Sequence, residues 1–275
     1  AQGNQDDNEI GDFKYDVPSG FLALCTKNLP SVDIIPSEHF NTVLYTGNGS
    51  DNHAISGVGF QPDFVWMKSR SAGRSHALVD SVRGRGSILF SDSSGAQQVP
   101  AAANNDLVSF DTDGFTVGTP ERAGSTNENN DTIVAWNWKA GGTASSNTNG
   151  SITSSVSANV DAGFSIVSYT GTGSASTIGH GLSASPDMII VKDRTNYDWF
   201  VFHIGDTAAP ETDFMNLNQT DATQDLNTIW NDTLPTASVF SVGTHIVVNT
   251  NTNDYIAYCF NSVDNYSKVG SYIGN

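Results

Sequence analysis

Short apolar segments separated by polar turn residues run along the whole chain. Examples are VLYT at 43–46, DFVWMK at 63–68, SILFS at 87–91, FTVG at 115–118 and TIVAWNW at 132–138. They are rich in Val, Ile, Phe and Trp, and Gly, Asn, Asp and Ser flank them, which is typical of strands and turns. No apolar stripe with the 3.6-residue period of a helix is sustained over helix length. The pattern predicts an all-β protein built as a β-sandwich, in which alternate side chains are buried between two sheets.

The strand pattern occurs twice. VLYTGNGS at 43–50 returns as VSYTGTGS at 167–174, and QPDFVWMKSR at 61–70 returns as SPDMIIVKDR at 185–194, with paired residue numbers differing by 124. Further along, FTVGT is matched by FSVGT and IVAWNW by YIAYCF, at an offset that drifts as changes in loop length would cause. Because the period exceeds that of solenoid repeats, the sequence predicts tandem whole domains.

The composition of the connecting segments gives approximate domain boundaries. We expect β-sandwich repeat 1 at 31–142 and β-sandwich repeat 2 at 143–266, the second entered through a connector rich in Ser, Thr, Asn and Gly. A fragmentary strand segment is expected at each end of the chain. Residues 1–30, with GFLALC as a strand, would close a preceding domain, and residues 267–275, with SYIGN echoing the repeated phrase, would start a third repeat.

One aromatic face admits two interpretations. Val134, Trp136 and Trp138 share a face at a spacing of two, and Ile256, Tyr258 and Phe260 are their counterparts. The favoured interpretation is a core strand in each copy, with these side chains, Trp66 and its counterpart Ile190 mostly buried. The alternative is an aromatic platform on which sugars stack.

Composition and motifs narrow the function. The 275 residues carry a formal net charge of -17, which disfavours binding to the nucleic-acid backbone. No apolar run approaches the roughly 20 residues that span a bilayer, so no membrane insertion is expected. The six histidines lack paired metal-ligand spacing, no GxSxG motif is present, and no pair of carboxylates is nominated for glycosidase chemistry. We therefore expect no enzyme activity, no cofactor and no metal.

Two smaller features each leave an alternative open. Cys25 and Cys259 lie in apolar, strand-like runs, which favours buried free thiols over a bridge between distant modules. Asp111 and Asp113 in SFDTDGF could ligate calcium, but a tight Asp-Gly hairpin explains them without an ion.

A cationic cluster stands out on this acidic chain. Five of its twelve cationic residues lie between positions 68 and 85: Lys68, Arg70, Arg74, Arg83 and Arg85. They are candidates for contact with an anion or a partner, either the Asp-rich loops of a neighbouring subunit or an acidic host glycan, because Arg binds carboxylates through a bidentate fork. Ordinary surface solvation is the third interpretation. Only Lys192 and Arg194 remain in the second copy.

Several segments together carry a family resemblance. FNTVLYTGNGS, GVGFQPDFVWMKSR, DSVRG, HGLSASPDMIIVKDR and YIAYCFNSVDNYSKVGSY resemble repeats in large structural proteins of marine tailed phages, of the tail-fibre or appendage type. The resemblance implies concanavalin-type jelly-roll domains, and DVPSGFLALCTKNLP is similar to the end of a SPRY-like domain. The second copy departs most over 203–232, where the DSVRG element is absent.

The resemblance implies a virion structural protein on the surface of an extracellular particle, serving host attachment. Its expected partners are further copies of itself in a homo-oligomer, other virion proteins and a host surface glycan. The alternatives from other classes are a carbohydrate-binding, lectin-like adhesin and a capsid-decorating protein.

Overall fold

A computed structural model describes residues 3–29, 34–121 and 126–274. The contacts divide the chain into two compact units, Ala1–Asp33 and Ile34–Asn275. Within the described part of the first unit there is a 3-10 helix, η1 (Thr26–Asn28), and no strand. The predicted strand GFLALC is therefore wrong: Phe21 and Leu24 are exposed because no sheet covers them, and Cys25 is only half-buried.

Strands dominate the second unit, and the prediction of an all-β fold is confirmed. The elements up to residue 138 are η2 (Pro36–Glu38), β1 (Phe40–Thr46), β2 (His53–Ser56), β3 (Phe64–Ser69), β4 (Ala77–Asp80), β5 (Leu89–Phe90), β6 (Leu107–Asp111), β7 (Gly114–Val117) and β8 (Thr132–Trp138). The later ones are β9 (Ser145–Asn147), β10 (Ser154–Asn159), β11 (Phe164–Thr170), β12 (Ser176–Gly179), β13 (Met188–Asp193), β14 (Trp199–His203), β15 (Asp213–Asn216), β16 (Gln224–Asp225), β17 (Val239–Val242), helix α1 (Ile246–Asn249) and β18 (Asp254–Phe260).

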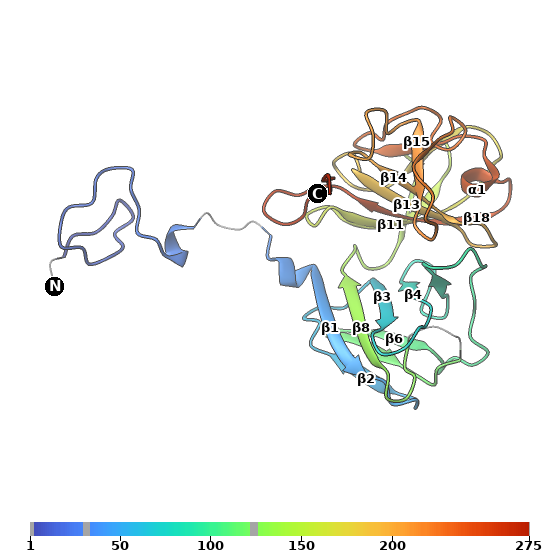
Figure 1. Cartoon of the computed structure of the whole chain (residues 1–275), viewed down its shortest axis with the longest axis horizontal. Helices are drawn as coiled ribbons and strands as arrows, with labels where there is room; N and C mark the ends of the chain where they lie inside the picture. Colours follow the sequence, from blue (N-terminus) through green and yellow to red (C-terminus); the bar gives the residue numbers. More distant parts are fainter. Residues whose placement is uncertain (1–2, 30–33, 122–125, 275) are drawn as a thin grey trace. The chain divides into compact units, whose positions relative to one another are not determined.

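Residues 40–138 form a sandwich of two antiparallel sheets. A five-stranded sheet has the order β1-β8-β3-β4-β5, and a three-stranded sheet has the order β2-β7-β6. Figure 1 shows β1, β8 and β3 of the larger sheet side by side. Val65, Met67 and Ile133 of the larger sheet pack against Phe115 and Val117 of the smaller one, and all five side chains are buried. This is the alternation that the short apolar segments predict.

Residues 145–260 repeat the arrangement with additional strands. An eight-stranded sheet has the order β16-β15-β14-β13-β18-β11-β10-β9 and faces a two-stranded sheet of β12 and β17. Tyr169, Val191 and Ala257 of the large sheet share a core with Ile178 and Phe240 of the small one. The order β11-β18-β13-β14 matches β1-β8-β3-β4, and β12-β17 matches β2-β7. We call residues 40–138 copy 1 and residues 145–260 copy 2; the domain boundaries given above stay predictions.

A third buried cluster joins the two copies. Phe64 and Leu78 on the outer face of the five-stranded sheet share it with Trp199, Ile256 and Tyr258 on the outer face of the eight-stranded sheet. The rings of Phe64 and Tyr258 stack at a centroid distance of 4.3 Å. Aromatic pairs at this spacing add to the stabilisation that area burial gives. The copies are therefore held together by a shared apolar core, which the repeat pattern alone did not predict.

The three tryptophans of copy 1 lie on the outer face of the five-stranded sheet. Trp66, Trp136 and Trp138 are half-buried rather than mostly buried, while the sandwich core takes Ile133 and Ala135 from the same strand β8. The predicted placement of the Trp face in the sandwich core is therefore wrong. Apolar residues lie on both faces of β8, so a spacing of two could not tell which face meets the small sheet. In copy 2 the counterparts Ile190, Ile256 and Tyr258 are buried in the shared cluster, and Phe260 is half-buried against it.

The last described residues add no sheet. Residues 268–274 contain no strand, and Tyr272 and Ile273 are almost fully exposed. The predicted strand segment at this end is therefore wrong for the residues that the structure describes. Within residues 3–29, 34–121 and 126–274, no helix is long and apolar enough to cross a membrane.

Candidate functional site

The five candidate cations have different surroundings. The guanidinium of Arg83 is fully buried, with its Nε 2.6 Å from Oδ2 of Asp80. Arg74 is bound by Asp131, 2.5 Å away, with Glu128 at 3.8 Å. Arg85 donates to the carbonyl oxygen of Ala103 at 2.6 Å. Arg83 and Arg74 already have carboxylate partners within copy 1 and are not free to receive an external anion.

The other two cations are less engaged. Arg70 is exposed and Lys68 is half-buried on the outer face of β3. Among the described residues neither has a recorded ion pair. The cluster predicted from the sequence is thus one buried ion pair, one paired surface arginine, one arginine held by a carbonyl and two cations open to a partner.

Arg83 lies at the centre of a buried polar network between the copies. Its Nη2 donates to the hydroxyl of Tyr258 in copy 2 at 3.1 Å, and that hydroxyl donates to Oδ2 of Asp80 at 2.8 Å. The same Nη2 donates to the carbonyl oxygen of Leu78 at 3.0 Å. Burial alone would lower the pKa of Arg83, but Asp80 and Tyr258 raise it, so the guanidinium stays charged. The element DSVRG, absent from copy 2, therefore forms an internal joint.

A loop of copy 1 extends this joint. Gln97 accepts from Nε of Arg194 at 2.8 Å, and its backbone N–H donates to the carbonyl oxygen of Arg194 at 2.8 Å. Lys192 is fully buried below the loop, where its Nζ donates to the carbonyl oxygens of Asp193 and Asn196, each at 2.7 Å, and of Ser94 at 3.4 Å. Burial lowers the pKa of Lys192 to about 8.

The repeated phrase YTGxGS closes each sandwich at the same place. In copy 1 the hydroxyl of Tyr45 donates to the carbonyl oxygen of Thr126, and in copy 2 that of Tyr169 donates to Val248. A Cβ on Gly47 would lie 2.2 Å from the carbonyl oxygen of Glu128, which leaves no room for a side chain. The phrase is therefore repeated for a structural reason.

Two buried asparagines hold these loops, and the sequence analysis missed them. Oδ1 of Asn127 accepts from the backbone N–H of Asn48 at 3.0 Å, and Oδ1 of Asn249 accepts from Thr172 at 2.8 Å. Both asparagines are fully buried. The signal was present, because each lies at the same distance before the last strand of its copy, six residues ahead of Ile133 and Tyr255.

The acidic turn has its carboxylates occupied by protein donors. Thr112 and Asp113 form the two-residue turn of the β6–β7 hairpin, in which Asp111 pairs with Gly114. Asp113 accepts from the backbone N–H groups of Gly57 at 3.1 Å and Gly59 at 2.7 Å. The hairpin interpretation describes these residues. Across the part of the chain that the structure describes, no three His, Cys, Asp or Glu side chains gather as a metal site.

The cysteines lie apart from any such chemistry. Cys259 is a buried free thiol on β18, as predicted, and burial raises its pKa to about 12. A thiol in this state is a poor nucleophile, since the thiolate is the reactive form. Cys25 is also free.

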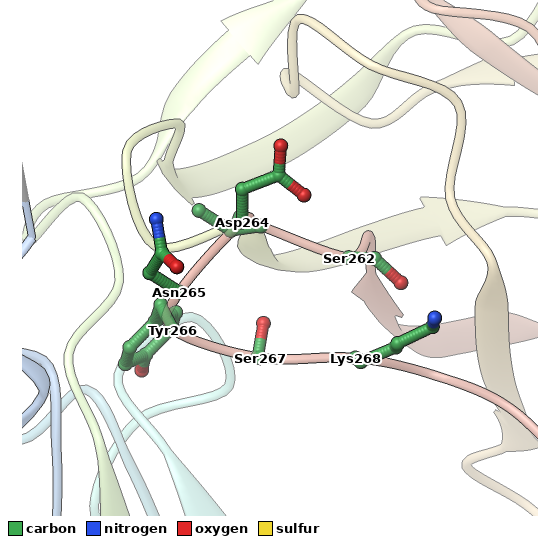
Figure 2. Close-up of a pocket in the computed structure, with 7 residues that line it drawn as sticks. Ser262, Asp264, Asn265, Tyr266, Ser267 and Lys268 are labelled. Carbon is green, nitrogen blue, oxygen red and sulfur yellow. The ribbon is translucent and has the colours of Figure 1, made fainter. Parts of the chain in front are cut away.

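Two hollows on the second unit deserve comparison. One, of about 330 Å³, is lined only by the consecutive residues 262–268, whose loop is closed by the backbone N–H of Val263 donating to Ser267 (Figure 2). Figure 2 shows Asp264 and Lys268 on separate arms of that loop. The other, of about 340 Å³, is lined by residues of both copies and includes Trp66. Because residues of both copies line it and Trp66 gives it an aromatic wall, the second is the candidate binding site.

The chain belongs to the family described as Domain of unknown function (DUF7483). The matched residues are 35–275, which is nearly all of the second unit. No curated protein and no solved structure matches the chain. The family description names no activity, ligand or partner.

Proposed function

We propose that this chain is a non-enzymatic structural protein of a phage virion, part of a tail fibre or similar appendage that serves host attachment. The resemblance of its repeats to structural proteins of marine tailed phages supports the class. The jelly-roll identity of each sandwich belongs to the same proposal.

The observation that carries the proposal is the joint between the copies. An apolar cluster joins the outer faces of the two large sheets, and the hydroxyl of Tyr258 in copy 2 is hydrogen-bonded to the buried pair of Asp80 and Arg83 in copy 1. Domains that move for catalysis or regulation usually meet through smaller and more polar interfaces. A repeated sandwich whose copies share a buried apolar cluster suits a structural component of a particle. Such a chain would assemble with copies of itself and with other virion proteins.

A carbohydrate-binding adhesin is the second candidate function. The hollow over Trp66 favours it, because a half-buried indole beside amide and hydroxyl groups suits a sugar ring. The two candidates are compatible, since attachment proteins present binding sites on a scaffold, and many copies on one particle would raise avidity.

Location on the particle tests the structural proposal. An antibody raised against residues 34–275 should label purified virions in immunoelectron microscopy, with gold at the tail appendages. Gold spread evenly over the head would instead indicate a capsid-decorating protein. Absence of the chain from purified virions, checked by mass spectrometry of their proteins, would refute the proposal.

A further inference from the structure

We propose that the hollow over Trp66 binds a neutral carbohydrate. The proposal rests on the attachment function above for its biological purpose, and it names the ligand class. Copy 1 contributes Trp66, His76, Ser91 and Asp92, and copy 2 contributes the segment 217–220. Its volume of about 340 Å³ is in the range of roughly 300–1,000 Å³ that small-molecule sites occupy.

The aromatic wall is rigid. Trp66 lies on β3 beside Trp136 of β8, and their rings meet edge to face at 6.3 Å. Both indoles are half-buried, so part of their surface stays accessible. A flat aromatic surface fixed in a sheet is well suited to the apolar face of a pyranose ring, because little side-chain entropy is lost on binding.

The polar wall is also held in place. Asn218 accepts from the backbone N–H of Trp199 at 2.9 Å and donates to Oδ1 of Asp198 at 2.7 Å. Gln219 donates to the same carboxylate oxygen at 3.0 Å. Oδ1 of Asp92 accepts from the backbone N–H of His76 at 2.9 Å. These contacts orient the side chains and leave two acceptors for ligand hydroxyls, which are Oε1 of Gln219 and Oδ2 of Asp92.

His76 adds an imidazole that can both donate and accept hydrogen bonds. Burial lowers its pKa, with a smaller contribution from Lys68 that Asp92 opposes. A neutral imidazole offers one donor and one acceptor. Sugar hydroxyls likewise donate and accept, so this wall matches a polyhydroxylated ring better than a purely apolar ligand.

The charge around the hollow favours a neutral ligand over an acidic one. Asp92 lines it, and Asp198 anchors Asn218 and Gln219 from behind. Lys68 is the cation whose charge reaches His76, while Arg74 and Arg83 are held by their own carboxylates. An anionic sugar would meet no surplus of positive charge here, on a chain whose net charge is -17.

The site exists only where the two copies diverge. Segment 217–220 follows β15 within 203–232, the stretch of copy 2 that departs most from copy 1. Trp66 corresponds to Ile190, which is buried in the shared cluster. The asymmetry therefore opens one indole on copy 1 and brings a polar loop of copy 2 over it.

Indole resonances test the proposal directly. The five tryptophans of the chain give five indole N–H signals in a ¹H–¹⁵N spectrum of the full protein, and Trp66→Phe assigns the key one. The probes are glucose, galactose, mannose, N-acetylglucosamine, lactose and maltose, each added to about 20 mM so that millimolar dissociation constants are detected. N-acetylneuraminic acid and glucuronic acid serve as anionic probes. At least one neutral sugar should shift the Trp66 signal and leave that of Trp230 unchanged.

Matched variants separate the site from the scaffold. Gln219→Ala changes an exposed residue and should weaken binding several-fold, and Trp66→Leu should weaken it about tenfold or more. Gln224→Ala, another exposed glutamine of copy 2 outside the hollow, should bind as the unchanged protein does. The proposal is overturned if no neutral sugar shifts Trp66, if only the anionic probes do, or if Gln219→Ala binds normally. Such a result would leave the virion labelling unaffected, so the two proposals fail separately.

Discussion

Substituting Asp80 by Asn should strongly destabilise the second unit. Asp80 and Arg83 are both fully buried, and the carboxylate receives the guanidinium Nε, the backbone N–H of Arg83 and the hydroxyl of Tyr258. The amide keeps the shape of the carboxyl group but leaves the cation without a countercharge. Removing one partner of a buried ion pair costs about 3–5 kcal/mol, and we expect a loss of that size.

Tyr258→Phe provides a graded comparison. It removes the hydroxyl that bridges the pair but keeps the ring that stacks on Phe64. One lost partner at a buried site costs about 1–3 kcal/mol. The double variant Asp80→Asn/Tyr258→Phe should lose less than the two single losses added together, because both changes act on one network.

The assay is urea unfolding at neutral pH, followed by tryptophan fluorescence and by far-UV circular dichroism. Asp161→Asn, at an exposed carboxylate of copy 2, is the matched control and should change the free energy of unfolding by less than about 0.5 kcal/mol. A loss below about 1 kcal/mol for Asp80→Asn, with an unchanged m-value, would refute the inference that the variant leaves the charge of Arg83 buried without a countercharge.

Three further outcomes follow from the packing. Gly47→Ala and Gly171→Ala should each cost about 1–3 kcal/mol in thermal denaturation, because an added Cβ would lie 2.2 Å from a backbone carbonyl oxygen, whereas Gly73→Ala, with nothing within 4 Å, should be neutral. The pKa of Lys192 is about 8 in the folded protein, below its unfolded value, so the unfolded chain binds more protons between these values. The free energy of unfolding should therefore rise by about 1 kcal/mol from pH 8 to pH 9, relative to the Lys192→Met variant. If the two proteins show the same pH dependence, the lowered pKa is contradicted. Trp136→Ala should lower the free energy of unfolding in urea by about 1–2 kcal/mol, because the ring is only half-buried. A fully buried tryptophan would cost about 3–5 kcal/mol, so a loss above about 4 kcal/mol would show that Trp136 is a core residue.

The features that the sequence predicted are local ones. The strands follow from period-two alternation and β-branched content. The β6–β7 hairpin follows from its Asp- and Gly-rich sequence, although the turn residues are Thr112 and Asp113 and Gly114 begins β7. The repeated phrase marks one structural position because a glycine and a tyrosine are each required there, as the contacts of Gly47 and Tyr45 show. These requirements act between neighbours in the sequence or within one sandwich, so they leave a visible pattern in the amino-acid sequence.

The features that it did not predict depend on contacts between the copies. Trp66 and Ile133 are equally apolar, and only the docking of the sheets decides which face is the sandwich core. Arg83 looks like a surface cation until Tyr258, 175 residues away along the chain, is placed beside it. The hollow over Trp66 depends on a loop of copy 2 for the same reason. Sequence patterns therefore do not reveal the candidate site, although the spacing of the tryptophans is compatible with an aromatic platform for sugars.

The differences between the copies explain how a repeated fold acquires one defined arrangement. On the outer face, the register places Asp80 opposite Phe64 in copy 1 and His203 opposite Met188 in copy 2. The buried pair of Asp80 and Arg83 in copy 1 is hydrogen-bonded to Tyr258 of copy 2, and copy 2 has no DSVRG element that would supply a second such pair. Specificity is the difference in affinity between alternative pairings, and contacts that only one pairing offers contribute to that difference. The similar inner cores thus give the sandwich twice, while the divergent outer faces supply the contacts that join copy 1 to copy 2.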